Sequence, residues 1–142
     1  MSEIQYKLRG VTVEQFATVY EPADGKIESK LTIPIKTNYD ERTLAVGANI
    51  QFSCDDKPFL IAESFCHYEI SEECWNELSA GATKDVELPT KFMDMLARIA
   101  IGTLRGVLAA KTENTPYSKY ILPILQIQSP KDRGDFILAK NN

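Results

Sequence analysis

The chain has 142 residues, 44% of them apolar and 25% charged, which suits one ordinary globular core and gives no sign of disorder beyond the ends. The formal net charge is -4 and the basic residues are scattered among acidic ones, so the basic stripe that a nucleic-acid partner requires is missing. The sequence shows no basic-then-apolar leader and no apolar run near the roughly 20 residues that span a bilayer, so we expect a cytoplasmic protein without membrane insertion.

Four runs in the first half of the sequence predict strands. Residues 11–20 are rich in valine, threonine and aromatic residues, and residues 30–37 alternate apolar with polar side chains. Pro34 lacks a backbone donor, so this second run requires a sheet edge or a bulge there. Residues 42–54 alternate most clearly, and residues 59–70 are apolar on both faces. No crossover helix separates these runs, which predicts a four-stranded antiparallel β-meander.

Two helices are predicted after the sheet. Ser71 is a favourable N-cap, and Glu72 and Glu73 would stabilise the N-terminus of a short crossover helix over residues 71–78. After a loop of small and charged residues, the spacing of apolar side chains predicts one long C-terminal helix over residues 91–111. The expected fold class is therefore α+β.

The long helix is apolar on two sides. We expect one stripe to cover the sheet: Phe92, Met95, Leu96, Ile99, Thr103 and Val107. A second apolar flank would remain exposed to solvent if the helix covered only a four-stranded sheet. We therefore assign this flank to a subunit interface: Ala97, Ala100, Ile101, Leu104 and Leu108. Gly102 and Gly106 each cost about 1 kcal/mol relative to alanine in a helix, which close packing against another helix would offset. A homo-oligomer is therefore expected.

The C-terminal part is less regular. Residues 117–128 form an extended apolar segment interrupted by Pro123, and residues 129–142 are polar apart from positions 136–138. We expect this tail to be poorly ordered and residues 1–142 to form a single domain.

The residues suited to metal or catalytic chemistry are few. Cys54, Cys66 and Cys74 lie at intervals of 12 and 8 positions, which fits neither a CxxC motif nor a zinc ribbon, so we interpret them as reduced thiols in the core and expect no metal site. His67 cannot pair with Cys66 because adjacent strand residues point to opposite faces, although Cys54 or Cys74 could approach it. Phosphate-binding glycine loops and a nucleophile elbow are absent from the sequence, and we predict no enzyme and no cofactor.

The order of these elements resembles the SecB family of export chaperones. The matching portions are residues 27–70 and 88–127, including Leu88-Pro89, Arg105-Gly106 at a helix end, Thr115-Pro116 and Ile121-Leu122-Pro123-Ile124. The resemblance implies a SecB-like fold and a tetramer, built as a dimer of dimers, that binds non-native chains along apolar grooves without ATP.

The resemblance also implies where the sites lie. A groove between the sheet, the crossover segment and the long helix would be lined by Trp75, Leu78, Leu88, Phe92 and Leu122, side chains that suit a core equally well. The family's acidic sheet surface, which contacts the translocase motor, would map in part to Asp55 and Asp56. The C-terminal tail is too short and too weakly periodic for the family's last helix and motor-binding tail, so contact with a motor is a weaker expectation than client holding.

We therefore expect an ATP-independent holdase for unfolded or non-native polypeptides such as preproteins. Two alternatives stay open: a dedicated chaperone for one partner, such as an antitoxin, and a small-ligand-binding protein or enzyme with a pocket between sheet and long helix that holds His67 or a cysteine. A purely structural oligomer is a further rival. The sequence identifies no client and does not distinguish a dimer from a tetramer.

Overall fold

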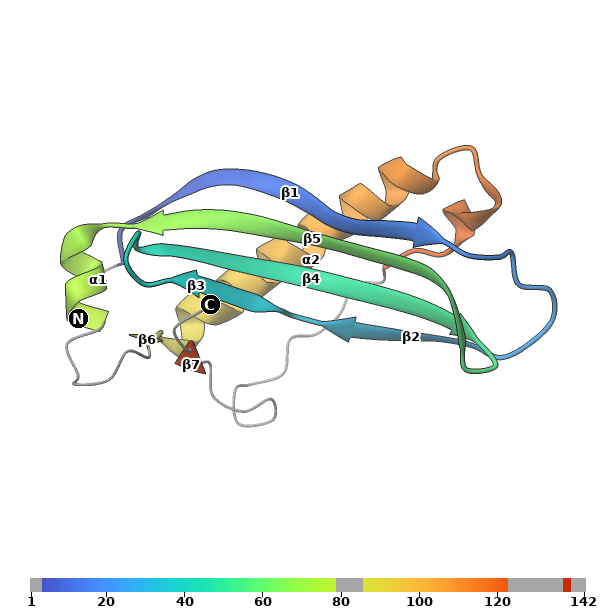
Figure 1. The fold of residues 1–142 in the computed structure, drawn as a ribbon, viewed down its shortest axis with the longest axis horizontal. Helices are drawn as coiled ribbons and strands as arrows, with labels where there is room; N and C mark the ends of the chain where they lie inside the picture. The colour runs from blue at the N-terminus through green and yellow to red at the C-terminus, as the bar shows by residue number, and fades with distance from the viewer. Residues whose placement is uncertain (1–3, 79–85, 123–136, 139–142) are drawn as a thin grey trace.

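The structure, a computed structural model, describes residues 4–78, 86–122 and 137–138. In these residues one long helix lies across one face of an antiparallel sheet (Figure 1). The predicted α+β class, with an antiparallel sheet and a long helix packed on it, is confirmed. In the part of the chain that the structure describes, no helix is both long enough and apolar enough to cross a membrane.

The sheet has five strands that pair antiparallel throughout. They are β1 (Tyr6–Thr18), β2 (Ile27–Thr32), β3 (Ile35–Asn38), β4 (Thr43–Cys54) and β5 (Lys57–Ile70). Their order across the sheet is β1-β5-β4-β2, and β3 pairs with β4 beyond the end of β2. Two long strands, β4 and β5, therefore form the centre, and β1 forms one edge.

The strand pairing differs from a simple meander in two ways. Pro34 divides the expected strand 30–37 into β2 and β3, and its carbonyl accepts from the backbone N–H of Gly47 at 2.8 Å. The first strand pairs with β5 instead of β2, which gives a Greek-key order. Because β5 is apolar on both faces, it belongs in the middle of the sheet, and β1 supplies its second neighbour.

The helices begin and end close to their predicted bounds. They are α1 (Glu72–Leu78), α2 (Thr90–Thr112) and the 3-10 helix η1 (Pro116–Lys119); two short strands, β6 (Val86–Glu87) and β7 (Ile137–Leu138), pair with each other. Ser71 caps α1 as predicted, because its Oγ accepts from the backbone N–H of Cys74 at 3.2 Å. The predicted poorly ordered tail, residues 129–142, lies outside the described residues except for β7, as do residues 123–128 of the predicted extended segment.

The core lies between α2 and the central strands. Alternate residues of β4 are buried against the helix, as the period of two predicts: Leu44, Val46, Ala48, Ile50 and Phe52. The buried residues of α2 that meet them are Met93, Leu96, Ala97, Ala100, Ile101, Leu104 and Leu108. Burying each of the larger side chains stabilises the fold by about 1.5–3 kcal/mol. The small side chains of Ala97 and Ala100 allow the helix to approach the sheet closely.

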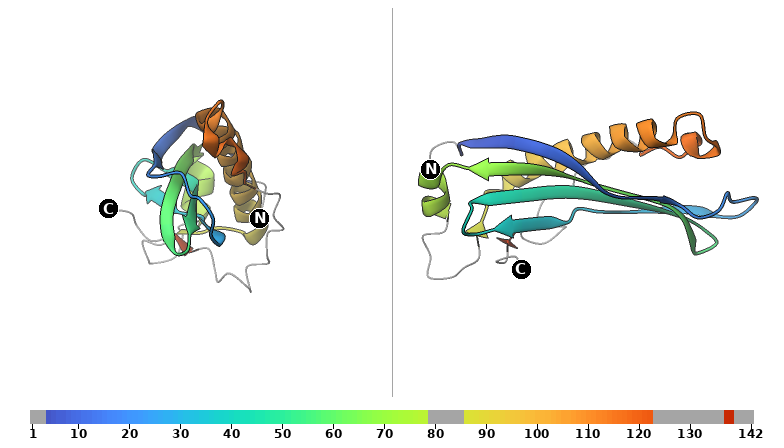
Figure 2. Two further views of the ribbon diagram at one scale, coloured as in Figure 1. Left: turned by 90° about the vertical axis from the view of Figure 1, so that its right-hand side faces the viewer. Right: turned by 45° about the horizontal axis from the view of Figure 1, so that its top comes forward.

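The opposite face of the sheet, called the open face below, has no helix over it among the described residues (Figure 2). Its one large buried side chain is Phe65, whose ring covers Gly47 on β4. A Cβ at Gly47 would lie 2.7 Å from this ring and 2.8 Å from the carbonyl oxygen of Ser64, so only glycine fits there. Lys36 covers the ring from outside, with Nζ 4.4 Å from its centroid. Within the described residues, this ring is thus covered by side chains of the sheet itself.

Tyr68 in β5 gives a test of the core that depends on pH. Its side chain is buried, its Oη has no hydrogen-bond partner within the described residues, and burial raises the pKa of its phenol above the ordinary value of 10.0. The folded protein therefore holds this proton more tightly than the unfolded chain, so the stabilisation is full below pH 10 and is lost as the pH rises further.

We expect Tyr68→Phe to change the free energy of unfolding by less than about 1 kcal/mol at pH 7, because no hydrogen bond is lost. Above pH 10 the variant should be more stable than the wild type. Urea titrations followed by circular dichroism at both pH values measure the difference. A loss of about 3 kcal/mol at pH 7 would show instead that the hydroxyl has a partner.

Candidate functional site

An apolar surface runs along the edge of the sheet beside α2. Four side chains of β1 lie on the face that carries the helix and stay exposed: Tyr6 (39%), Leu8 (51%), Val11 (47%) and Val13 (42%). Their face follows from the register, since Leu8 and Val11 stand opposite Tyr68 and Cys66, whose side chains are buried under α2. Exposed apolar side chains are ordinary when single, but a contiguous row of them indicates a binding surface.

One stripe of α2 continues this surface. The Tyr6 ring lies 5.1 Å from the Phe92 ring, centroid to centroid, and the Tyr6 hydroxyl donates to Sδ of Met95 at 3.8 Å. One turn further along the helix, Ile99 is 38% exposed. We call this set the β1–α2 surface: Tyr6, Leu8, Val11, Val13, Phe92, Met95 and Ile99.

The surface exists because of where the helix lies. α2 packs on β4 and β5 and leaves β1 largely uncovered. β1 also pairs on one side only, with β5, so the backbone groups on its other side are free within the described residues. A free strand edge beside apolar side chains is a ready template for another extended chain.

The predicted groove residues are divided between core and surface. Trp75, Leu88 and Leu122 are buried, and the Trp75 ring packs against Tyr39 with centroids 5.6 Å apart. Leu78 and Phe92 are only partly buried, and both pack on the core. Of the five, Phe92 is the one that joins the β1–α2 surface. Large apolar residues near a helix start look the same in sequence whether they fill a core or line a groove.

The two stripes of α2 lie differently from the sequence expectation. The residues predicted to form a subunit interface are all buried within the same chain: Ala97, Ala100, Ile101, Leu104 and Leu108. Of the stripe predicted to cover the sheet, Leu96 is fully buried and Thr103 contacts Cys66 of β5, whereas Ile99 is exposed and Phe92 and Met95 face β1. The physical reason is size, because the alanine-rich stripe lets the helix approach the sheet more closely.

The two helix glycines lie outside the core. Gly102 and Gly106 are exposed, and a Cβ at either position would meet nothing within 4 Å. Contacts within the described part of the chain therefore do not require glycine at these positions. A close approach by another helix remains the prediction for them.

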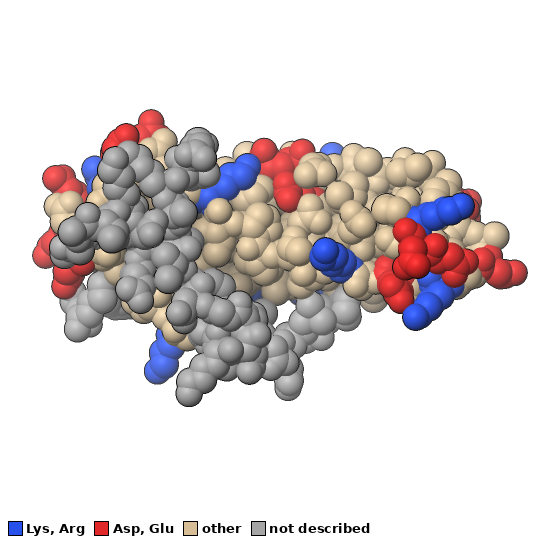
Figure 3. All heavy atoms as spheres, turned by 60° about the horizontal axis from the view of Figure 1, so that its bottom comes forward, with Lys and Arg blue, Asp and Glu red and all other residues tan. Residues whose placement is uncertain are grey.

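Asp55 and Asp56 form the turn of the β4–β5 hairpin. Both have positive φ values, 48° and 68°, which matches a tight hairpin turn. Oδ1 of Asp55 accepts from the backbone N–H of Lys26 at 3.0 Å, so this carboxylate also has a structural role. Acidic and basic side chains are mixed at this end of the molecule (Figure 3), where Lys26 also pairs with Glu28 at 2.9 Å. The predicted acidic docking surface is therefore a small mixed patch.

The cysteines and His67 are far from forming a catalytic group. Cys54, Cys66 and Cys74 are free thiols, all buried. Cys66 points to the helix side, with Sγ 3.5 Å from Oγ1 of Thr103, while His67 lies on the open face with Nε2 2.7 Å from Oγ1 of Thr12. The prediction that these neighbours face opposite sides is confirmed. Within the described residues, no three His, Cys, Asp or Glu side chains gather as a metal site would need.

The first strand, β1, begins earlier than the sequence predicted. The expected strand began at residue 11, whereas β1 begins at Tyr6 and contributes Tyr6 and Leu8 to the surface. The signal was present in the alternation of Tyr6 and Leu8 with Lys7 and Arg9, which is the period of a strand with one apolar face.

Comparisons with known proteins give no family for this chain. No family model matches it, and no curated protein matches it. A solved structure of a protein of unknown function from Streptococcus agalactiae is 13% identical with a TM-score of 0.44, covering 89% of this chain and 100% of that one. A SecB-like chaperone from Mycobacterium tuberculosis, in complex with a ChAD peptide from an antitoxin, is 12% identical with a TM-score of 0.36, covering 89% and 90%. Values this low do not support inferring function from the likeness.

Ile99 and Ala100 are neighbours with opposite environments, which gives a matched test of the helix orientation. Ala100→Arg should destabilise the protein by about 3–5 kcal/mol or unfold it, because an unpaired charge would be buried under the sheet. Ile99→Arg should leave the melting temperature within a few degrees of the wild type, because this site is exposed. Thermal melts followed by circular dichroism compare the two. If Ala100→Arg folded and Ile99→Arg did not, the stripe that contains Ile99 would be the one that packs on the sheet.

Proposed function

We propose that this protein is a molecular chaperone that holds non-native polypeptides in the cytoplasm without ATP. The observation that supports it most is the β1–α2 surface, where a row of exposed apolar side chains borders a free strand edge. Unfolded chains expose apolar side chains and unpaired backbone groups together, and this surface offers partners for both.

The composition of the surface suits many different clients. It combines two aromatic rings, Tyr6 and Phe92, with the flexible thioether of Met95 and with branched aliphatic side chains. Methionine adapts its shape to different partners, and apolar contacts do not depend on one fixed orientation. Affinity would then come from several weak contacts, which is what holding without chemistry requires.

Self-association through the same surface is our proposal for the oligomer. An antiparallel pairing of two β1 edges would place the exposed apolar side chains of the two copies next to one another. Apolar residues would then meet on the helix side. A dimer of this kind, or a tetramer made of two such dimers, would compete with clients for β1.

Three more specific functions can be compared with the structure: a chaperone for one partner, a protein that contacts a translocase motor, and a small-ligand enzyme. A chaperone dedicated to one partner would use the same surface but protect only that partner. Contact with a translocase motor would involve Asp56, since Asp55 already binds the Lys26 backbone. For a small-ligand enzyme, no observation places His67 or a cysteine in a pocket, because His67 lies on the open face and the three thiols are buried.

We expect the wild type, in stoichiometric excess and without nucleotide, to suppress the aggregation of several chemically unfolded clients in a light-scattering assay. Leu8→Asp and Ile99→Asp should each weaken client binding about tenfold, which corresponds to about 1.4 kcal/mol of lost apolar contact. Circular dichroism should stay native for both, because both sites are exposed.

Two control variants make this result specific. Ile121→Asp changes an exposed apolar residue outside the β1–α2 surface and should hold clients as the wild type does. Trp75→Asp places a charge in the core and should lose the fold itself. Aggregation of every client despite excess wild type would remove the holdase proposal, and an equal effect of Ile121→Asp would remove the assignment to this surface.

A further inference from the structure

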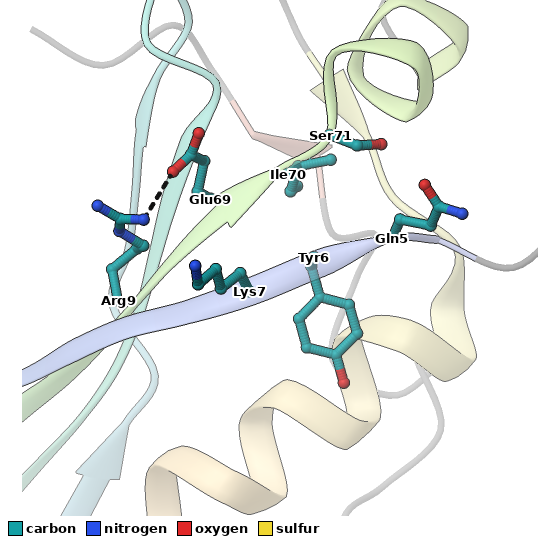
Figure 4. Close-up of a pocket in the computed structure, with 7 residues that line it drawn as sticks. All are labelled: Gln5, Tyr6, Lys7, Arg9, Glu69, Ile70 and Ser71. Atoms are coloured by element: carbon teal, nitrogen blue, oxygen red, sulfur yellow. Dashed lines mark ion pairs between the residues drawn. The ribbon is translucent and has the colours of Figure 1, made fainter.

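A pocket of about 320 Å³ opens at the start of β1 (Figure 4). Its lining includes Tyr6, Lys7 and Arg9 from β1, with Glu69 and Ile70 from the end of β5. Figure 4 shows Arg9, Lys7 and Glu69 on one side of the strand and the Tyr6 ring on the other, directed toward α2. The pocket thus joins the open face to the free edge of the sheet.

Positive charge exceeds negative charge on this side of the pocket. Glu69 pairs with Arg9 through Oε1 at 3.4 Å and with Arg42 through Oε2 at 3.8 Å. Lys7 stands opposite Glu69 in the strand register, yet it makes no ion pair with a carboxylate of the described residues. Three cations surround one carboxylate, and three minus one leaves a local charge of +2.

Arg42 is held in place by the fold before any ligand binds. Its φ is 56°, a left-handed conformation that is uncommon for a residue with a side chain. Two bonds to Ile70 secure it: the Ile70 backbone N–H donates to the Arg42 carbonyl at 2.9 Å, and Arg42 Nε donates to the Ile70 carbonyl at 3.3 Å. The ordered guanidinium helps to hold Glu69, whose other carboxylate oxygen pairs with Arg9.

The backbone beside the pocket is available for pairing. The Ser71 backbone N–H donates to the Gln5 carbonyl at 2.9 Å, so Gln5 directs its carbonyl toward β5. In an antiparallel ladder this direction alternates, which turns the N–H and C=O of Tyr6 and Leu8 outward to the free edge. A strand added there would place alternate side chains on the two faces. Its side chains on the open face would contact Lys7, and its side chains on the helix face would contact Tyr6 and Leu8.

We propose that this pocket binds an acidic side chain of an extended peptide segment in which acidic and apolar residues alternate. The carboxylates lie over Lys7 and Arg9 on the open face, and the apolar side chains lie on the β1–α2 surface. The inference rests on the proposed function and specifies it, because it states which client segments bind first. It also gives a role to Lys7, a cation without an ion pair among the described residues.

Basic side chains on an edge strand have a simpler use, since charge at an edge discourages unwanted strand pairing. That role would disfavour every added strand and would show no preference for acidic peptides. The two roles therefore differ in whether β1 prefers acidic peptides, and a peptide-binding measurement distinguishes them.

The test compares a labelled peptide that alternates glutamate with valine and the matched peptide that alternates glutamine with valine, by fluorescence anisotropy. The glutamate peptide should bind about fivefold more tightly at low salt, and the difference should shrink as salt is added. Lys7→Glu should abolish this preference. Lys30→Glu, which changes an exposed lysine on the opposite edge strand β2, should leave it intact.

Aggregation suppression, measured in parallel, separates failure of this inference from failure of the proposed function. Lys7→Glu should still hold clients that lack acidic residues, whereas Leu8→Asp should lose both activities. Equal binding of the two peptides would overturn the inference and leave the holdase in place. Competition by free glutarate as strong as that by the peptide would overturn it in favour of a small-ligand site. Dissociation of a dimer by Lys7→Glu, without peptide binding to the wild type, would assign the edge to a second copy.

Discussion

The packing of one alanine-rich stripe of α2 on the two central strands is the contact on which the rest of this structure depends. Ala97 and Ala100 allow the helix axis to lie close to β4 and β5, and the buried side chains of Leu104 and Leu108 continue this packing along the helix. A helix in this position covers the centre of the sheet but leaves the edge strand uncovered. Burial at the centre thereby leaves the edge exposed, and this exposed edge is the candidate binding surface.

Much of this fold could be predicted from the sequence, because strand and helix periods are local properties. The alternation through β4, the cap at Ser71 and the extent of α2 are all readable in short windows. The pairing of β1 with β5 was not readable, since alternation gives the faces of a strand but not its neighbour. The orientation of α2 failed for a related reason: two apolar stripes overlap on it, and only three-dimensional fit decides which of them meets the sheet.

The candidate site illustrates the same limit. Sequence reasoning looked for large apolar residues near the crossover segment, and the structure places Trp75, Leu88 and Leu122 of that set in the core. The surface instead combines the first residues of β1 with a stripe some ninety residues later, joined by the contact between Tyr6 and Met95. Because β1 reaches this place by pairing with β5, no local window could have shown that the two segments are neighbours. In the proposed function the same edge would bind both clients and a second copy, which would link assembly and holding by mass action.

The anchoring of α2 also has a consequence for how quickly the protein can act. A lid or hinge must open before it binds, and its opening rate then limits association. Here the helix is fixed by seven buried apolar side chains, and the surface beside it is already exposed. Association should therefore be a single bimolecular step, with a rate proportional to client concentration and no plateau from a slow rearrangement. A holding protein that competes with aggregation gains most from such immediacy, because aggregation accelerates with the concentration of unfolded chains.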